Sequence, residues 1–306
     1  MCSGEEHSKL MAKWVRRGLR PLHKVWSKTK LACSMPGLYV NWPAAIGSLI
    51  ARERKPVVLR LRRGVDLSLL ARSLDTYIVN EIWIDKIYTP SAKFAIRDGW
   101  VVVDLGGHKG IFSVFAATVA KNVRVFTFEP SPENFRLLSH NLDLNHLSNV
   151  KAFNIAVSGE SGKSILHLFP DHGQNTLLQR ANQQLRPTSD VTVETWSLAR
   201  ILREVGAPVN LLKMDIEGME YETLFSCPPE QLQKIERIAL EYHEDVVLTS
   251  HRVPELVEFL ERSGFSTRLD PAREILLAER ISEKQVSVKE QDRRSILVNL
   301  VEEKTA

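Results

Sequence analysis

The chain has 306 residues, 43% of them apolar and 25% charged, with 41 Lys and Arg against 37 Asp and Glu. These values are ordinary for a globular protein and argue against a wholly disordered, fibrous or membrane protein. The positive charge is concentrated at the start, because residues 1–63 hold fourteen basic and three acidic side chains, a balance of +11 that leaves −7 for residues 64–306. Since the larger part of the chain is acidic, we expect no nucleic-acid partner.

The cysteine count and a long uncharged stretch give information on the cellular compartment of the protein. An odd, sparse set of cysteines with no zinc-binding spacing indicates a reducing compartment: Cys2, Cys33 and Cys227. The uncharged stretch 31–51 is interrupted by prolines and glycines, which disfavours a membrane span. We therefore expect a cytoplasmic protein.

Residues 1–95 are expected to form a basic N-terminal extension. Between residues 9 and 30, eight basic residues alternate with leucines and tryptophans. Two interpretations stay open: a helix in peripheral contact with an anionic membrane surface, or a solvated helix with its apolar residues packed on the main domain. Further along, alternation of apolar and basic residues predicts a strand at 56–64, and helical spacing predicts a helix at 75–88.

From residue 99 onward, apolar runs alternate with amphipathic segments. The expected strands are 100–105, 123–128, 150–157, 165–169, 191–195, 211–215 and 238–242, and the expected helices are 111–120, one from Ser131, 198–205, 220–225 and 254–263. This alternation predicts an α/β fold with a doubly wound, mostly parallel sheet over residues 96–280. Residues 281–306 are expected to be a charged tail with a possible last strand at 295–301. Ligands of such sheets bind at the carboxyl ends of the strands.

The first strand of this region ends in a glycine-containing turn that reads VVVDLGGHKG, with Asp104 two residues before Gly106. The turn departs from the dinucleotide fingerprint G-x-G-x-x-G. An acid at this point suits a ligand with an ammonium group, such as S-adenosylmethionine, better than it suits a pyrophosphate. The alternative is a turn that only packs a helix on a strand.

Glu129 ends the second strand, 19 residues after Gly110. This spacing is close to the roughly 20 residues at which an acid binds a ribose hydroxyl pair. The alternative is a cap for the next helix, which begins at Ser131-Pro132.

Acids and a histidine follow the last two strands of the alternating region. Asp215, Glu217 and Glu220 come after one strand, and His243 comes after the next. The three acids could bind a divalent metal, act as a base or favour a helix N-terminus. A histidine here could accept the proton of a hydroxyl nucleophile or serve only as a turn residue. From the sequence we assign no metal site.

Several blocks occur in the order and with the spacing of one family: VVVDLGGHKGIFS, FTFEPSPENFRLLSHNLDLN, NVKAFNIAVSGESG, VETWSLARIL, LLKMDIEGMEYETL and IALEYH. Over residues 99–278 the chain resembles the FkbM-type methyltransferases. The resemblance implies a class I S-adenosylmethionine-dependent methyltransferase of Rossmann-like fold that O-methylates a hydroxylated small molecule, such as a sugar or a polyketide.

The resemblance also implies roles for individual residues. The cofactor's amino-acid portion is expected at Asp104, Gly106, Gly107, His108 and Gly110, its ribose at Glu129 and its adenine beside Ile155 and Ala156, while Asp215, Glu217 and His243 face the methyl group and the acceptor. The chain departs from the family at Gly107-His108, where Ala-Asn is common. A dinucleotide-dependent oxidoreductase and a catalytically inactive S-adenosylmethionine-binding module stay open as alternatives.

Overall fold

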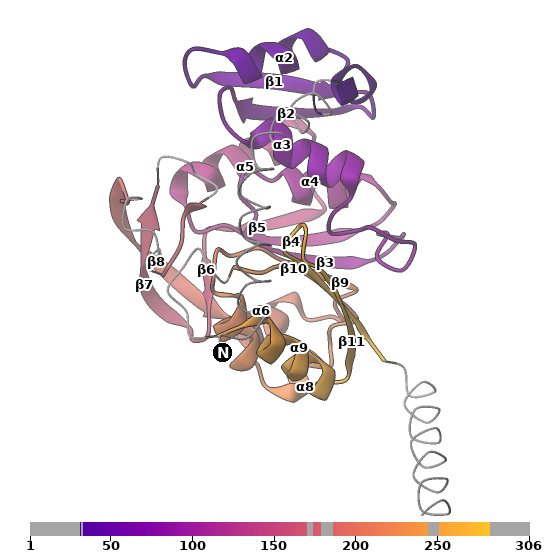
Figure 1. Cartoon of the computed structure of the whole chain (residues 1–306), viewed down its shortest axis with the longest axis vertical. Helices are drawn as coiled ribbons and strands as arrows, with labels where there is room; N and C mark the ends of the chain where they lie inside the picture. The colour runs from indigo at the N-terminus through magenta and orange to yellow at the C-terminus, as the bar shows by residue number, and fades with distance from the viewer. Residues whose placement is uncertain (1–30, 32, 170–173, 179–185, 244–250, 282–306) are drawn as a thin grey trace, which may run out of the picture. The chain divides into compact units, whose positions relative to one another are not determined.

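The structure, a computed structural model, describes residues 31, 33–169, 174–178, 186–243 and 251–281 (Figure 1). The chain divides into two compact units, residues 1–84 and 85–306, and each is described by itself. The basic segment 9–30, residues 171–173 and 179–185 of the loop 171–190, and the possible last strand 295–301 lie outside the described residues.

The first unit is built around a two-stranded antiparallel sheet. Its elements are α2 (Trp42–Ile50), β1 (Pro56–Leu61), β2 (Val65–Leu70), α3 (Asp75–Asn80) and the π-helix η1 (Glu81–Asp85), at whose end the second unit begins. Gly64, at φ +78°, closes the hairpin in the left-handed conformation that such a short loop requires. The predicted strand at 56–64 is confirmed as β1. The predicted helix at 75–88 begins at Asp75 but continues as a π-helix and is shorter than expected.

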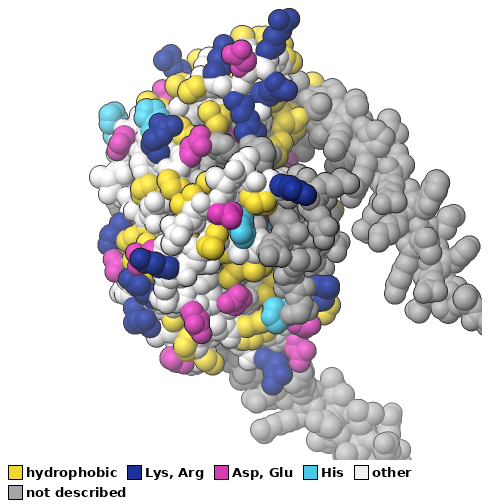
Figure 2. Space-filling view, turned by 90° about the vertical axis from the view of Figure 1, so that its left-hand side faces the viewer, with side chains coloured by type: hydrophobic (Ala, Val, Ile, Leu, Met, Phe, Trp, Pro, Cys, Tyr) yellow, Lys and Arg dark blue, Asp and Glu magenta, His cyan; other side chains and the backbone are white. Residues whose placement is uncertain are grey.

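The charge of this unit is visible on its surface. Residues 33–84 include seven Lys and Arg against four Asp and Glu. Figure 2 shows several of these basic side chains lying together on the exposed face of the unit. Among the described residues, none of the helices combines the length and the apolar character that a membrane span requires.

The second unit contains the strands and helices expected from the alternating pattern and, in addition, a helix at 229–232 and strands at 265–270 and 275–280 that were not expected. In chain order they are β3 (Val101–Leu105), α4 (Ile111–Thr118), β4 (Arg124–Phe128), α5 (Pro132–Leu144), β5 (Val150–Phe153), β6 (Ala156–Ser158), β7 (Gly162–Leu168), β8 (Ser189–Ser197), α6 (Leu198–Val205), β9 (Leu211–Met214), α7 (Glu220–Phe225), α8 (Pro229–Leu232), β10 (Arg237–Glu241), α9 (Val253–Arg262), β11 (Phe265–Asp270) and β12 (Ile275–Arg280).

Seven of these strands form one sheet in the order β11-β12-β10-β9-β3-β4-β5. The five from β10 to β5 are parallel, and β12 and β11 add an antiparallel edge. In Figure 1, α4 and α5 lie on one face of this sheet and α6, α8 and α9 on the other. Buried apolar side chains from the strands and from helices such as α6 and α9 form the core. The doubly wound, mostly parallel α/β fold predicted from the sequence is confirmed.

The apolar run 150–157 is not one strand, as was expected, but two. The chain bends at Asn154, whose side-chain amide donates to the carbonyl oxygens of Glu129 (2.8 Å) and Pro130 (3.0 Å). Beyond the bend, β6 pairs with β8 in a separate three-stranded sheet, β6-β8-β7. This bend brings the start of β6 next to the end of β4.

The strand order reverses between β3 and β9. From β3 the chain adds β4 and then β5 on one side, and it returns later to add β9 and β10 on the other. Helices that lead away in opposite directions leave a crevice at such a switch point, beside the carboxyl ends of the strands. The residues that follow β3 and β9 are therefore the first place to look for a site.

Candidate active site

The turn after β3 contacts the end of β9 so closely at Gly106 that no side chain fits there. Gly106 has φ +81°, and a Cβ on it would lie 1.8 Å from the carbonyl oxygen of Asp215. A Cβ on Gly107 would lie 2.3 Å from Thr127 Oγ1 on β4. The glycine turn therefore connects directly to the backbone on which the acidic cluster begins.

His108 occupies a backbone conformation that explains the residue types found there. Its φ of +48° is left-handed, a region that asparagine and histidine enter more readily than most residues. Its backbone N–H donates to Glu129 Oε2 at 2.7 Å. A histidine in place of the family's common asparagine is thus compatible with the same turn, and Gly107 beside it leaves room for Thr127.

Glu129 is buried at the end of β4 with its carboxylate already oriented. Besides His108, the backbone N–H of Ser131 (2.9 Å) and the side-chain amide of Asn134 (3.4 Å) donate to it. Burial raises the pKa of Glu129 to about 7, although these hydrogen bonds act in the opposite direction. Its backbone N–H donates to Phe153 O at 3.0 Å, which places the chain leading to Ile155 beside it. Ile155 and Ala156 are themselves buried.

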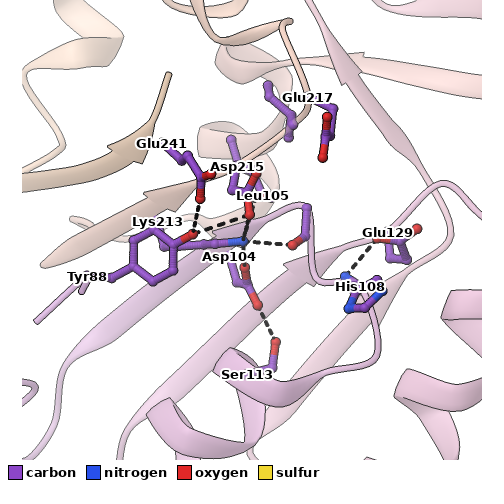
Figure 3. A network of polar contacts seen from close by, with 12 residues as sticks. Tyr88, Asp104, Leu105, His108, Ser113, Glu129, Lys213, Asp215, Glu217 and Glu241 are labelled. Atoms are coloured by element: carbon purple, nitrogen blue, oxygen red, sulfur yellow. Dashed lines mark hydrogen bonds and ion pairs between the residues drawn. The ribbon is translucent and has the colours of Figure 1, made fainter. Parts of the chain in front are cut away.

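Asp104 was expected to contact the ammonium group of a ligand directly, but in the structure its carboxylate pairs with a lysine of the chain. Its side chain is 0% exposed, and its carboxylate lies 3.2 Å from Lys213 Nζ (Figure 3). Ser113 Oγ on α4 donates to its other oxygen at 2.6 Å. The ammonium group next to Asp104 is therefore the chain's own, and Asp104 supports the turn from within.

Lys213 links the glycine turn to the acidic cluster. Its Nζ donates to Gly106 O (2.7 Å) and lies 3.9 Å from Asp215 Oδ2. Burial alone would lower the pKa of Lys213, but the carboxylates of Asp104 and Asp215 raise it above its ordinary value. The buried ammonium therefore stays charged. Lys213 was not among the predicted site residues, although a lysine inside the apolar run LLKM is a signal of such a role.

Asp215, Glu217 and His243 converge at the carboxyl ends of β9 and β10. His243 Nε2 lies 3.9 Å from Glu217 Oε2 and 4.0 Å from Asp215 Oδ1. Glu241 Oε1 lies 4.0 Å from the same nitrogen. The hydroxyl of Tyr88 is 3.2 Å from both Asp215 Oδ2 and Glu241 Oε2 (Figure 3). Tyr88 is 127 residues from Asp215, and no motif marked it in the sequence.

Glu220 holds His243 from behind. It is fully buried at the start of α7, accepts from the backbone N–H groups of Ile216 and Gly218 (both 3.0 Å), and lies 3.1 Å from His243 Nδ1. Burial alone would lower the pKa of His243, but Glu220, Glu217 and Asp215 raise it well above its ordinary value. These acids favour the protonated imidazole, and a positive charge placed beside the ring would act in the opposite direction.

The sequence-predicted residues thus form two adjoining groups. The turn from Gly106 to Gly110 and Glu129 make one, and Asp215, Glu217 and His243 make the other. Asp104 is buried and is paired with Lys213, which also contacts both groups. Ile155 and Ala156 follow Phe153, whose carbonyl oxygen accepts from the backbone N–H of Glu129. Their individual roles stay predictions.

Comparisons with known proteins agree on one family. The sequence matches the family model described as the methyltransferase FkbM domain over residues 104–267, more than half of the chain. It is 30% identical over 228 residues to the methyltransferase sdnD of Sordaria araneosa, covering 64% of this chain and 84% of that protein. It is 26% identical over 235 residues to the 31-O-demethyl-FK506 methyltransferase FkbM of Streptomyces tacrolimicus, covering 68% of this chain and 88% of that protein.

The solved structures to which the chain shows some similarity include two methyltransferases. A precorrin-6y C5,15-methyltransferase from Geobacter metallireducens matches 62% of this chain and 85% of its own with 14% identity and a TM-score of 0.38. A SAM-dependent methyltransferase from Aquifex aeolicus matches 65% and 90% with 12% identity and a TM-score of 0.35. The class I S-adenosylmethionine-dependent methyltransferase fold predicted from the sequence is confirmed, and the chain belongs to the FkbM methyltransferase domain family.

Proposed function

We propose that this methyltransferase transfers the methyl group of S-adenosylmethionine to a hydroxyl oxygen of a small molecule. One observation carries the proposal: the glycine turn and the acidic cluster abut. The Asp215 backbone N–H donates to Leu105 O at 3.0 Å, and its carbonyl leaves no space for a side chain at Gly106. A cofactor on the turn would therefore present its reactive end to the cluster.

The residues on the cofactor side fit this molecule. Glu129 keeps acceptor capacity beyond its three N–H contacts, because a carboxylate offers about four lone-pair sites, and this suits a ribose diol. The glycine turn lets a ligand approach the backbone closely. The acids near Gly106 favour a cationic sulfonium. We assign the amino-acid portion to the turn and the adenine to the side of Ile155 and Ala156.

The acceptor side supplies hydrogen-bond acceptors for a hydroxyl. When the acceptor oxygen bonds to the methyl carbon, the carbon–sulfur bond breaks to leave a neutral thioether, and the hydroxyl proton passes to the cluster. Asp215, Glu217 and His243 are the residues that hold the hydroxyl and take this proton. Alignment is the larger contribution, up to about 7–11 kcal/mol in well-oriented systems.

An oxygen acceptor is supported by one relative's name and by the chemistry of the cluster. The name of the Streptomyces tacrolimicus relative, 31-O-demethyl-FK506 methyltransferase, denotes methylation at an oxygen. Carboxylates accept hydrogen bonds from a hydroxyl and position its oxygen. A dinucleotide-dependent oxidoreductase is not favoured, because the turn lacks the required glycine spacing.

The test separates binding from turnover. We expect calorimetric titration to show S-adenosylmethionine binding and no NAD binding, and radiolabelled S-adenosylmethionine to transfer label to a hydroxylated small molecule. Asp215→Asn and His243→Ala should lower turnover by about 10²–10⁴ if they remove the proton acceptor, with cofactor binding largely kept. Glu255→Gln, at an exposed acid on α9, is the matched control. Loss of cofactor binding in both site variants would assign them to the architecture of the pocket, and tight binding without transfer would indicate an inactive binding module.

A further inference from the structure

We infer that Asp215, Glu217 and His243 form a binding site for one divalent cation. Each residue offers one ligand atom, and these atoms lie within 4.8 Å of one another. Ligands placed 2.0–2.2 Å from a common ion are at most about 4.4 Å apart, so the 3.9–4.0 Å separations at His243 Nε2 are of the size that one ion spans. Small rotations of the Asp215 and Glu217 carboxylates would bring all three ligand atoms to bonding distance from one ion.

The orientation of His243 is a second, independent indication. The side chain is only 8% exposed, and within the described part of the chain its Nε2 has no hydrogen-bond partner closer than the three carboxylates at 3.9–4.0 Å. Its Nδ1 faces buried Glu220 at 3.1 Å. When a cation replaces the proton on Nε2, the carboxylate behind the imidazole keeps the Nδ1–H in place and the Nε2 lone pair faces the ion, as in the carboxylate–histidine–metal arrangement.

The surrounding charge also favours a cation. Four carboxylates (Asp215, Glu217, Glu220 and Glu241) surround one imidazole, and each lies within 4.0 Å of a ring nitrogen. The neighbouring ammonium, Lys213, is shared with Asp104 at 3.2 Å and is 3.9 Å from Asp215. Acids held this close repel one another in a partly buried site, and a divalent cation offsets that repulsion.

The backbone of Glu217 is held in an unusual conformation. Its φ is +53°, and Thr176 Oγ1 donates to its carbonyl oxygen at 2.6 Å. A left-handed glutamate is costly and persists only where the surroundings impose it, which is frequent at ligand sites. Here the conformation carries the Glu217 carboxylate to within 3.9 Å of His243 Nε2.

The ligand set indicates an ion that accepts carboxylate oxygen together with one imidazole nitrogen, such as Mn²⁺. The further role of the ion rests on the proposed function. An ion at this place lies on the acceptor side, where it lowers the pKa of a hydroxyl drawn to it and so eases loss of the proton.

The test uses the full chain, depleted of metal with a chelator, and titrates it with Mn²⁺ in the absence of cofactor and acceptor. Electron paramagnetic resonance is expected to show one bound Mn²⁺ per chain, with nitrogen coupling from an imidazole. Asp215→Asn and Glu217→Gln should each weaken binding at least tenfold, and Glu220→Gln about 10- to 100-fold through His243. Glu255→Gln, which removes the acid paired with His251 on α9, should bind as the wild type does.

Two results overturn the site: no Mn²⁺ bound at millimolar concentration, or binding that Asp215→Asn and Glu217→Gln leave unchanged. Glu217→Gln keeps the size of a partly exposed side chain, and its thermal unfolding without metal checks that it folds. Methyl transfer at the full rate in excess chelator overturns the role of the ion and leaves the proposed function intact. Bound Mn²⁺ with no methyl transfer to any acceptor supports the site and contradicts the function.

Discussion

Replacement of Gly106 by alanine tests the contact between the glycine turn and the acidic cluster. The added Cβ would lie 1.8 Å from the Asp215 carbonyl oxygen, whereas Cβ atoms in proteins essentially never come closer than 3.0 Å to such an atom. Asp215 must then move by roughly 1 Å. Because the obstructing atom belongs to the backbone, a change of rotamer cannot relieve the overlap.

The expected loss of unfolding free energy in Gly106→Ala has two parts. Alanine at φ +81° costs about 1–2 kcal/mol for the left-handed conformation. Forcing a Cβ into a filled space costs about 1–3 kcal/mol more. Gly99 separates the two parts, since it has φ +77° but nothing within 4 Å of its Cβ position. The free energy of unfolding should therefore fall by about 2–5 kcal/mol in Gly106→Ala and by only about 1–2 kcal/mol in Gly99→Ala.

Urea titrations followed by circular dichroism measure both losses of stability. Calorimetric titration with S-adenosylmethionine then shows whether the displaced turn still binds the cofactor, and we expect binding to be lost in Gly106→Ala and kept in Gly99→Ala. Equal losses of stability in the two variants would show that the Asp215 carbonyl moves freely. Full cofactor binding by Gly106→Ala would refute the assignment of the cofactor to this turn.

Three further predictions concern the groups around the turn. Burial raises the pKa of Glu129 from 4.5 to about 7, so the stability that its protonated form contributes is present at low pH and is lost as the pH rises between these values. Relative to Glu129→Gln, the free energy of unfolding of the wild type should fall by about 3 kcal/mol between pH 4 and pH 8 in urea titrations. A difference between the two proteins that does not change with pH would show that Glu129 does not titrate in this range. Because the ionised carboxylate is the better ribose acceptor, cofactor affinity should rise over the upper part of this range in the wild type only. His108→Asn should unfold within about 0.5 kcal/mol of the wild type, whereas His108→Val should lose about 1–2 kcal/mol, and similar losses in both would contradict the role of the left-handed backbone. Lys213→Met should lose about 3–5 kcal/mol by leaving Asp104 unpaired, and adding Asp104→Asn should recover part of it; strictly additive losses would deny the pairing.

The parts of the site that the sequence predicts are those fixed by the ends of strands. The buried runs that became β3, β4, β9 and β10 are continuous and apolar, so their carboxyl ends can be located to within a residue. Parallel strands place those ends on one edge of the sheet. The meeting of Asp215 and Glu217 with His243 follows from that rule.

The parts that the sequence does not predict depend on register and on distant contacts. Asp104 meets Lys213 because β3 and β9 pair at those two residues, and an apolar pattern does not specify which residues lie opposite one another. Tyr88 reaches Asp215 across 127 residues. The antiparallel edge strands β11 and β12 were not predicted either: β11 buries little beyond Phe265 and shows no apolar run, whereas β12 has a buried apolar run at its start that was not assigned to a strand from the sequence.

A crystal structure of the protein with S-adenosylhomocysteine, the product of methyl transfer, tests most directly whether the cofactor binds at the glycine turn with its sulfur beside the acidic cluster. We expect the ribose hydroxyls on Glu129, the amino-acid portion on the turn from Gly106 to Gly110, and the sulfur facing Asp215 and His243. A ligand bound elsewhere, or one whose sulfur faces away from Asp215, would contradict this placement.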